Sequence, residues 1–313
     1  MAQLTRPVDP FGEVDVYRSA TGGLGVVAKV LMLPDIEGTR CGLALDASAS
    51  MKSLYGVTGM VSTAFKSAAA AAPNLVEPVA RSMAAFLANF AHDGKVSLLY
   101  WAVSPDGSAT EEIGRFSGDD VQAVPFGGPK KMPWGRGTKL LPAVRYFVES
   151  AFDGAPWAIG VFVTDGIVED IADVKTYCMN FGKQIAAGQR KSCKFVLIGL
   201  GHEVSQDQME ELDDMFEGSG LKTPEGDEID IWDHKLASEM QKLEEVFAEV
   251  VSENVTVVAS GKIVDQKGRV AREFPDGVPA FIRFELPADA TSFTLDFPGG
   301  SIKQDISEVL GRL

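Results

Sequence analysis

Three oxygen-bearing side chains at alternate positions follow an apolar segment early in the chain. Asp46, Ser48 and Ser50 come directly after the apolar run 41–45. In a tight turn that leaves a buried strand, such side chains converge on one point, and oxygen is the ligand type that Mg²⁺, Mn²⁺ and Ca²⁺ prefer. The same residue types also favour a helix start, since Asp and Ser are common N-cap residues. The turn therefore predicts either a site for a hard divalent cation or a helix cap.

Two later segments supply side chains of the same kind. Thr138 lies in the glycine-rich loop 135–139, just before an apolar helical run, and Asp165 follows the buried apolar run 158–164. Asp-x-Ser-x-Ser, then Thr, then Asp after a later strand resembles the metal-ion-dependent adhesion site (MIDAS) of von Willebrand factor type A (VWA) domains, the family that includes integrin I domains. The resemblance implies that the metal ligands, some of them through water, are Asp46, Ser48, Ser50, Thr138 and Asp165.

A narrower resemblance concerns the residues around this turn. The run 46–56, the segment 92–96 and the apolar strand that ends in 100–102 are similar to the cytoplasmic VWA proteins of bacterial tellurium-resistance and related stress gene clusters. Two features depart from that pattern. Ala49 stands between the serines where Gly is usual, and an insertion at 51–74 adjoins the metal loop. Alanine leaves the ligands unchanged, whereas the insertion can cover or reshape the binding face.

The resemblance implies a metal-dependent protein-interaction module. Three neutral hydroxyls and two carboxylates leave a divalent ion with appreciable positive character, so the ion takes one more anionic ligand. In the family, that ligand is an Asp or Glu carboxylate of a partner protein. Related cytoplasmic VWA proteins are encoded beside AAA+ ATPases or tellurium-resistance proteins, so a protein of either kind is the expected partner. Mg²⁺ is the expected metal, with Mn²⁺ and Ca²⁺ as alternatives.

Two other classes of protein stay open on sequence alone. Asp with Mg²⁺ also serves phosphoryl transfer, but haloacid-dehalogenase phosphatases place a second Asp two residues after the nucleophile, where this chain has Ser48. The chain has no G-x-x-x-x-G-K-[ST] loop, and His92, His202 and His234 stand in no recognisable relation to a nucleophile. We therefore expect no enzyme and predict no catalytic residue. A Mg²⁺-dependent phosphohydrolase-like enzyme and a structural protein that assembles into homo-oligomers are the alternatives.

Composition and charge narrow the class of partner. The 313 residues include 29 Lys and Arg against 44 Asp and Glu, a formal charge of −15, without a strong basic cluster. Nucleic-acid binding needs a basic surface, so nucleic acid is not an expected partner. Cys41, Cys178 and Cys193 are odd in number and widely spaced, which predicts reduced, buried thiols. Because the sequence shows neither a signal peptide nor an apolar stretch long enough to cross a bilayer, we expect a cytoplasmic protein.

Alternating strand and helix patterns between residues 39 and 252 predict an α/β domain with a doubly wound, mostly parallel sheet of the VWA or Rossmann-like type. Strands are expected at 41–46, 95–103, 111–116, 158–164, 194–200 and near 229–232, and helices at 75–91, 140–152, 169–188, 206–216 and 236–251. Such sheets bind ligands beyond the carboxyl ends of their strands. The predicted metal ligands follow two of these strand ends.

The two ends of the chain predict a β-rich appendage. A hairpin is expected over 14–33, although 23–28 fits a loose dinucleotide-binding fingerprint, because a β-branched segment follows these glycines instead of a helix. An isolated hairpin is marginally stable in water. We therefore expect the N-terminal extension 1–38 to pack with a C-terminal β-rich module, 253–313, in a β-sandwich, with the VWA domain 39–252 inserted between them.

Overall fold

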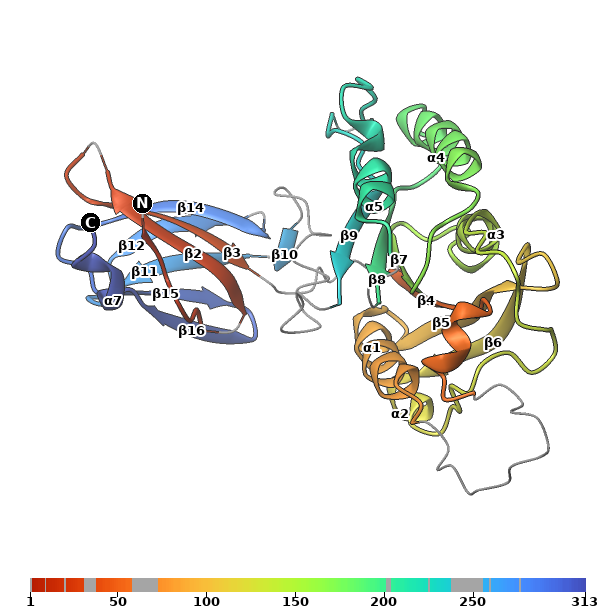
Figure 1. The fold of residues 1–313 in the computed structure, drawn as a ribbon. Coiled ribbons are helices and arrows are strands. Elements are labelled where there is room, and N and C mark those ends of the chain that lie inside the picture. Colours follow the sequence, from red (N-terminus) through yellow and green to blue (C-terminus); the bar gives the residue numbers. More distant parts are fainter. Residues whose placement is uncertain are drawn as a thin grey trace. The chain divides into compact units, whose positions relative to one another are not determined.

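The computed structural model describes residues 2–8, 10–19, 21–30, 38–57, 73–200, 204–224, 226–237, 256–258, 260–275 and 277–313. The chain divides into two compact units (Figure 1). The first unites Met1–Asp35 with Glu244–Leu313, and the second comprises Ile36–Leu243. The predicted domain boundary at 252/253 lies outside the described residues.

The second unit is built on a six-stranded sheet with the order β6-β5-β4-β7-β8-β9. Neighbouring strands are parallel except β6, which pairs antiparallel with β5 at the sheet edge. The strands are β4 (Arg40–Asp46), β5 (Lys95–Val103), β6 (Ala109–Ser117), β7 (Ala158–Thr164), β8 (Cys193–Gly199) and β9 (Trp232–Leu236). The predicted fold class, α/β with a mostly parallel sheet, is confirmed.

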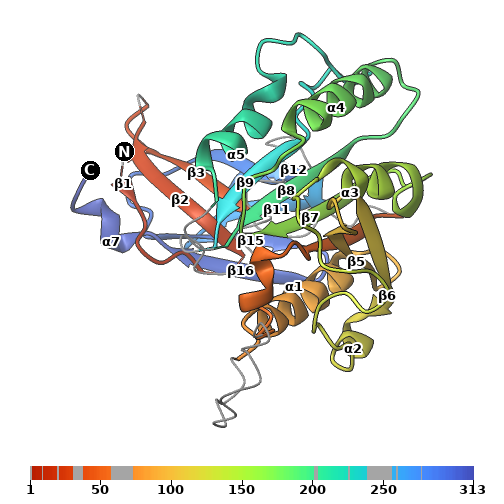
Figure 2. The same ribbon diagram turned by 45° about the vertical axis from the view of Figure 1, so that its right-hand side comes forward.

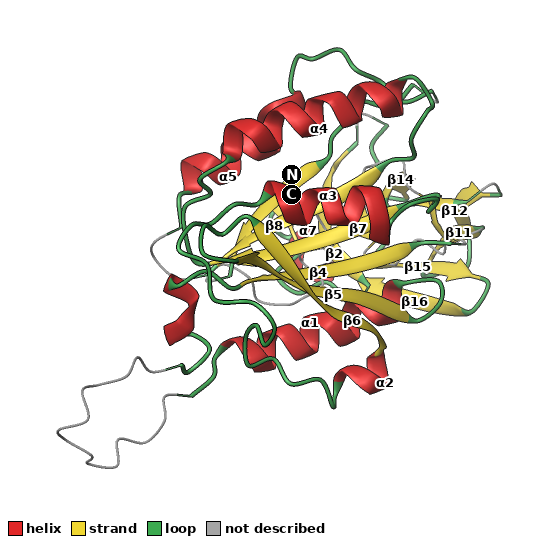
Figure 3. Cartoon of the chain, turned by 90° about the vertical axis from the view of Figure 1, so that its right-hand side faces the viewer, coloured by secondary structure: helices red, strands yellow, loops and turns green. Residues whose placement is uncertain are grey.

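Helices cover both faces of this sheet (Figure 3). One face carries α1 (Val76–Phe90) and α2 (Gly118–Val121), and the other carries α3 (Leu141–Tyr146), α4 (Ile171–Ala186) and α5 (Gln206–Asp213). Burial on both sides explains why the central strands are almost wholly apolar. No helix among the described residues combines the length and the apolar character that crossing a membrane requires.

One aromatic ring of the core packs closely against two central strands. Phe147, which begins a π-helical segment after α3, contacts β4 and β7 where Gly42 and Gly160 leave room for its ring. A Cβ atom on Gly42 would lie 2.4 Å from that ring. Cys41, Cys178 and Cys193 are buried in the same unit as free thiols, as predicted.

Two sequence predictions near the end of this unit are wrong in position. The last strand is expected near 229–232 but begins at Trp232. The apolar residues Ile229 and Ile231, which suggest a strand, are buried in the segment that leads into it. The helix expected at 236–251 does not begin at Leu236, which is the last residue of β9. Residues 238–251 lie outside the described residues, as do 58–72 of the predicted insertion.

The first unit contains antiparallel sheets with the orders β1-β2-β3-β14, β12-β11-β15-β16 and β10-β13. Its elements are β1 (Ala2–Gln3), β2 (Phe11–Arg18), β3 (Leu24–Val30), β10 (Thr256–Val258), β11 (Gly261–Asp265), β12 (Val270–Phe274), β13 (Val278–Pro279), β14 (Phe281–Leu286), β15 (Ser292–Phe297), β16 (Gly300–Asp305) and α7 (Ser307–Leu310). The segment after Gly23 is a strand, so it is not a dinucleotide-binding loop, which would open a helix.

Both chain ends contribute to the core of the first unit. Strand β3 pairs with β14 from Leu24 opposite Leu286 to Lys29 opposite Phe281. Figure 2 shows the red strands of the N-terminal hairpin against the blue strands from the end of the chain. Side chains of both four-stranded sheets, such as Val26 and Phe293, share one hydrophobic cluster. The hairpin thus obtains the packing partner that it lacks in isolation.

His234 on β9 contacts Asp213 at the end of α5, with 2.5 Å between Nδ1 and Oδ2. This hydrogen bond raises the pKa of His234 above its usual 6.5. The stability from the pair is therefore complete below the unfolded-state pKa and is lost as the pH rises through the raised pKa.

We expect Asp213→Asn to destabilise the protein more at about pH 6 than at about pH 8.5, as measured by urea unfolding. Asp207→Asn, on the exposed first turn of the same helix, is the control. Equal losses of Asp213→Asn at both pH values would contradict the assignment.

Candidate metal centre

The predicted ligands lie where the strand order of the sheet reverses. From β4 the chain proceeds outward through β5 and β6, and it then returns to β7 on the other side of β4. Asp46 is the last residue of β4, and Asp165 directly follows β7. Open α/β sheets bind ligands at this point, because the connections from the two strands diverge and leave a crevice.

A chain of hydrogen bonds joins most of the predicted ligands. The Ser50 hydroxyl donates to Asp165 Oδ1 over 2.8 Å, and the Ser48 hydroxyl lies 2.9 Å from that of Ser50. The amide of Ser48 donates to Asp46 Oδ1 over 2.6 Å. A Cβ atom placed on Gly166 would lie 3.9 Å from both Ser50 Oγ and Thr138 Oγ1. The structure thus brings the five side chains together, and their role as ligands stays a prediction.

Backbone hydrogen bonds hold the Asp46 turn between its neighbours. The amide of Ala47 donates to the carbonyl of Trp101 on β5 over 2.9 Å. The amide of Ala49 donates to the carbonyl of Gly135 over 2.7 Å, and the amide of Gly135 donates back to Ala47 over 3.2 Å. The turn and the Thr138 loop therefore form one connected unit.

The alternative of a helix cap is wrong for this turn. A short 3₁₀ helix, Ser50–Ser53, does follow it, but its N-cap residue is Ala49, which makes no side-chain cap. The carboxylate of Asp46 instead accepts hydrogen bonds from its own turn and from β7. The polar side chains of the turn therefore form hydrogen bonds with one another and with β7 and the residue after it, and they do not cap the helix.

Two residues that the sequence analysis missed position Asp46. The Thr164 hydroxyl donates to Asp46 Oδ2 over 2.6 Å and accepts from the amide of Gly166. The Tyr55 hydroxyl donates to the backbone carbonyl of Asp46 over 3.1 Å. Thr164 could have been noticed as a hydroxyl at the end of an apolar strand. Nothing local to Tyr55 indicates its role.

The segment after β7 also fixes the Thr138 loop. Asp170 accepts hydrogen bonds from the amides of Leu140 and Leu141 at the start of α3, over 2.8 and 3.0 Å. The amide of Glu169 donates to the carbonyl of Thr138 over 2.9 Å. Trp134, in the same loop, packs edge-on against Tyr55 at 5.1 Å between ring centroids, so it anchors the loop.

The electrostatics of Asp46 fit a bound cation. Its side chain is fully buried, and no cationic side chain among the described residues pairs with it. Burial, with a smaller contribution from the Asp165 carboxylate, raises its pKa to about 6, although hydrogen bonds from Thr164 and Ser48 act in the opposite direction. Buried carboxylates without a positive partner are costly, and the donors around them are all oxygen. That donor set suits Mg²⁺, Mn²⁺ or Ca²⁺.

We expect Thr164→Val to weaken Mg²⁺ binding roughly tenfold to a hundredfold, the usual cost of losing a group that orients a ligand. Valine keeps the shape of the side chain but removes the hydrogen bond to Asp46. Thr164→Ser, which keeps the hydroxyl, should bind almost as well as the wild type. Isothermal titration of Mg²⁺ into EDTA-treated, dialysed protein measures the affinity of each variant. If Thr164→Val binds Mg²⁺ as tightly as the wild type, Thr164 does not position a metal ligand.

Comparison with known proteins yields structural similarities only. No protein-family model matches the sequence, and no curated protein matches it. The structure is similar to the SpRpn10 VWA domain, with 10% identity, a TM-score of 0.39, and coverage of 68% of this chain and 94% of that one.

Two further solved structures are similar to this chain. Proximal thread matrix protein 1 from the mussel byssus, with a zinc-occupied MIDAS motif, has 11% identity and a TM-score of 0.40 over 72% of this chain and 48% of that one. The pilus adhesin SpaC from Lactobacillus rhamnosus GG, in its open conformation, has 10% identity and a TM-score of 0.41 over 97% of this chain. The chain spans 48% of that adhesin's length. Similarities at this level assign no family.

Proposed function

We propose that this protein is a metal-dependent protein-interaction module of the MIDAS-bearing VWA type. Its metal ligands are Asp46, Ser48, Ser50, Thr138 and Asp165. The observation that supports this most strongly is the chain of hydrogen bonds that joins Asp46, Ser48, Ser50 and Asp165 at the point between β4 and β7 where the strand order reverses.

The residues of the site set the charge that a ligand meets. Asp46 and Asp165 supply two negative charges, and the three hydroxyls are neutral. A bound Mg²⁺ supplies a coordination centre that a carboxylate can complete. Hydrogen bonds from Thr164 and Ser50 hold the two carboxylates in place. Because the two carboxylates balance the charge of the ion and the chain has a formal charge of −15, an acidic side chain of a partner would bind by completing the coordination of the metal and not by long-range attraction.

The proposal includes the kind of cell, the compartment and the partner of the protein. The resemblance of 46–56 and 92–96 to VWA proteins of tellurium-resistance and stress gene clusters supports a bacterial, cytoplasmic adaptor. Its partner would be an AAA+ ATPase or a tellurium-resistance protein that presents an Asp or Glu. Mg²⁺ is the proposed metal, with Mn²⁺ and Ca²⁺ as alternatives.

We expect Ser48→Ala to lose metal-dependent capture of the partner. Tagged protein is incubated with a bacterial lysate in Mg²⁺ or in EDTA, and proteins retained only with Mg²⁺ are identified. Ser53→Ala, which changes an exposed hydroxyl at the end of the 3₁₀ helix that follows the turn, is the control. If the wild type retains the same proteins in EDTA as in Mg²⁺, or if Ser48→Ala retains the same proteins as the wild type, the proposed metal-dependent interaction is wrong.

The same preparations distinguish the alternatives. Hydrolysis of phosphate esters or nucleotides with Mg²⁺, if it disappears in Asp46→Asn, would indicate a phosphohydrolase-like enzyme. Homo-oligomers that sediment equally in Mg²⁺ and EDTA, with no captured protein, would indicate a self-assembling structural role.

A further inference from the structure

A small pocket lies at the opposite ends of the strands from the metal centre. Its walls include Ala158 and Cys193, the first residues of β7 and β8, whereas Asp165 follows the last residue of β7. Seven residues of strand, at about 3.3 Å each, separate these two ends. The pocket is therefore a separate feature of the second unit, to which the metal site contributes no residue.

The pocket is partly open, and buried apolar side chains form part of its lining. Phe152, Phe181, Ala158 and Cys193 line it, and each is at most 7% exposed. The cavity volume is about 190 Å³. A cavity of about 150 Å³ lined by apolar side chains holds a benzene molecule, so this one accommodates a ring of that size.

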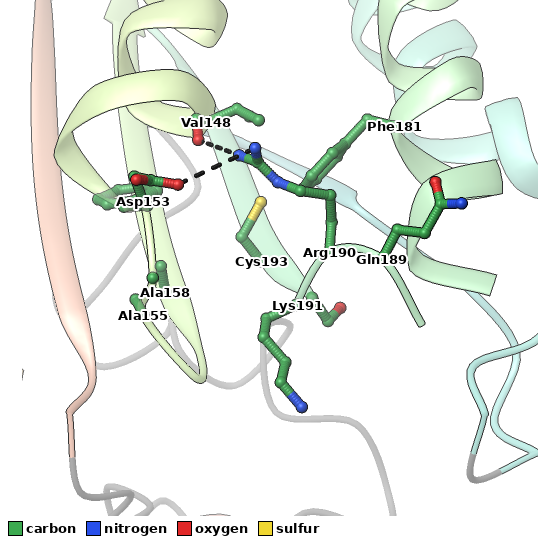
Figure 4. Close-up of a pocket in the computed structure, with 12 residues that line it drawn as sticks. Val148, Asp153, Ala155, Ala158, Phe181, Gln189, Arg190, Lys191 and Cys193 are labelled. Atoms are coloured by element: carbon green, nitrogen blue, oxygen red, sulfur yellow. Dashed lines mark hydrogen bonds and ion pairs between the residues drawn. The ribbon is translucent and has the colours of Figure 1, made fainter. Parts of the chain in front are cut away.

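A single arginine crosses one side of the pocket (Figure 4). The Arg190 guanidinium donates to the carbonyl of Val148 and lies over the ring of Phe181, 5.8 Å from its centroid. Its nearest carboxylate, on Asp153, lies 4.0 Å away and is 69% exposed. Exposed ion pairs at this distance contribute little, so the guanidinium is fixed in position but only weakly neutralised.

The charges around the opening favour an anion. The ionisable side chains that line the pocket, apart from the Cys193 thiol, are Arg190, Lys191 and Asp153, two positive and one negative. A planar guanidinium matches a carboxylate through paired hydrogen bonds. The chain as a whole is strongly acidic, which makes this locally positive opening above an apolar floor distinctive.

We propose that this pocket binds a small carboxylate with a benzene-sized apolar body, of which benzoate is the simplest representative. The ring occupies the floor between Phe152 and Phe181, and the carboxylate accepts hydrogen bonds from Arg190 in place of its contact with Asp153.

Binding of benzoate to the whole protein tests the proposal, measured by calorimetry or ligand-observed NMR. EDTA is present throughout, because a carboxylate also binds a divalent cation, and Asp46→Asn is measured in parallel. We expect saturable binding that Asp46→Asn does not change. Benzamide, a neutral molecule of the same shape, should bind roughly tenfold to a hundredfold more weakly, as expected for the loss of a charge-assisted hydrogen bond. Failure of the metal-dependent interaction would leave this result unaffected.

Variants locate the binding to the pocket. Arg190→Gln should bind benzoate and benzamide equally weakly, and Asp153→Asn should tighten benzoate binding a few-fold by removing the competing carboxylate. Arg145→Gln is the matched control, since Arg145 also lies over an aromatic ring and pairs with a carboxylate but lines no part of this pocket. No saturable binding, equal affinity of the wild type for benzoate and benzamide, or a preference for benzoate that survives in Arg190→Gln would each overturn the proposal.

Discussion

Asp46→Asn should abolish the stabilisation of this protein by Mg²⁺ and leave the metal-free protein at least as stable as the wild type. In the wild type, Mg²⁺ at about a hundred times its dissociation constant should add about 2.7 kcal/mol. For a domain of this size, that corresponds to a rise of roughly 5–10 °C in melting temperature.

The physical reason is the position of one charge. Asp46 is fully buried, and no cationic side chain of the described residues pairs with it. A cation in the site offsets this charge, whereas in EDTA the charge only costs free energy. Asparagine keeps an oxygen that can accept from the amide of Ser48, and the Thr164 hydroxyl can rotate to accept from the new amide group.

Thermal unfolding with Mg²⁺ and with EDTA measures both parts of this prediction. Asp227→Asn, an exposed carboxylate without a side-chain hydrogen bond among the described residues, is the control and should keep the full shift. If Asp46→Asn still gains stability from Mg²⁺, the site lies elsewhere. If its metal-free form is several degrees less stable, Asp46 serves the fold and not a cation.

Gly135→Ala should cost about 3 kcal/mol of stability, the upper part of the range for overpacking, and should weaken Mg²⁺ binding at least about tenfold. A Cβ atom at this position would lie 2.0 Å from the carbonyl oxygen of Ala102 and 2.9 Å from the Cα atom of Gly107. These are backbone atoms, so they cannot move aside by a rotamer change. Gly135 also exchanges backbone hydrogen bonds with Ala47 and Ala49, so a shift separates Thr138 from the Asp46 turn.

Urea unfolding and metal titration measure the two effects of this substitution. Gly127→Ala is the matched control, because a Cβ atom on Gly127 would meet nothing within 4 Å. A Gly135→Ala variant as stable as the control would show that Gly135 does not lie close to the backbone of Ala102 and Gly107. A destabilised variant that binds Mg²⁺ normally would show that the contact does not position Thr138.

The central strands of the second unit could be predicted from the sequence because their side chains are buried on both faces of the sheet. Strands β4 and β7 are apolar runs because helices cover both of their faces, and the first carboxylate after each run lies where the chain leaves the sheet. Asp46 and Asp165 are these residues. Their meeting at one place follows from the parallel arrangement, since carboxyl ends of parallel strands share one edge of the sheet.

The position of strand β9 could not be predicted from a run of apolar residues. Its residues Asp233 and His234 are polar, so no apolar run marks the strand. Lys194 Nζ, from β8, lies 3.1 Å from Asp233 Oδ2, and Asp213 pairs with His234. Polar side chains can occupy a buried strand only when partners from elsewhere in the chain satisfy them, and no local pattern announces those partners.

The sequence by itself therefore determined the α/β class of the second unit, the positions of its central strands along the chain and which oxygen-bearing residues follow them, because burial imposes a local pattern of apolar residues. Only the tertiary structure decided what holds those residues in place. Thr164 bonds to Asp46 across 118 residues, and Arg190 bonds to Val148 across 42. Such contacts depend on how strands and helices pack, so the sequence shows Thr164 as a hydroxyl at a strand end but identifies neither its bond to Asp46 nor the pocket beside Arg190.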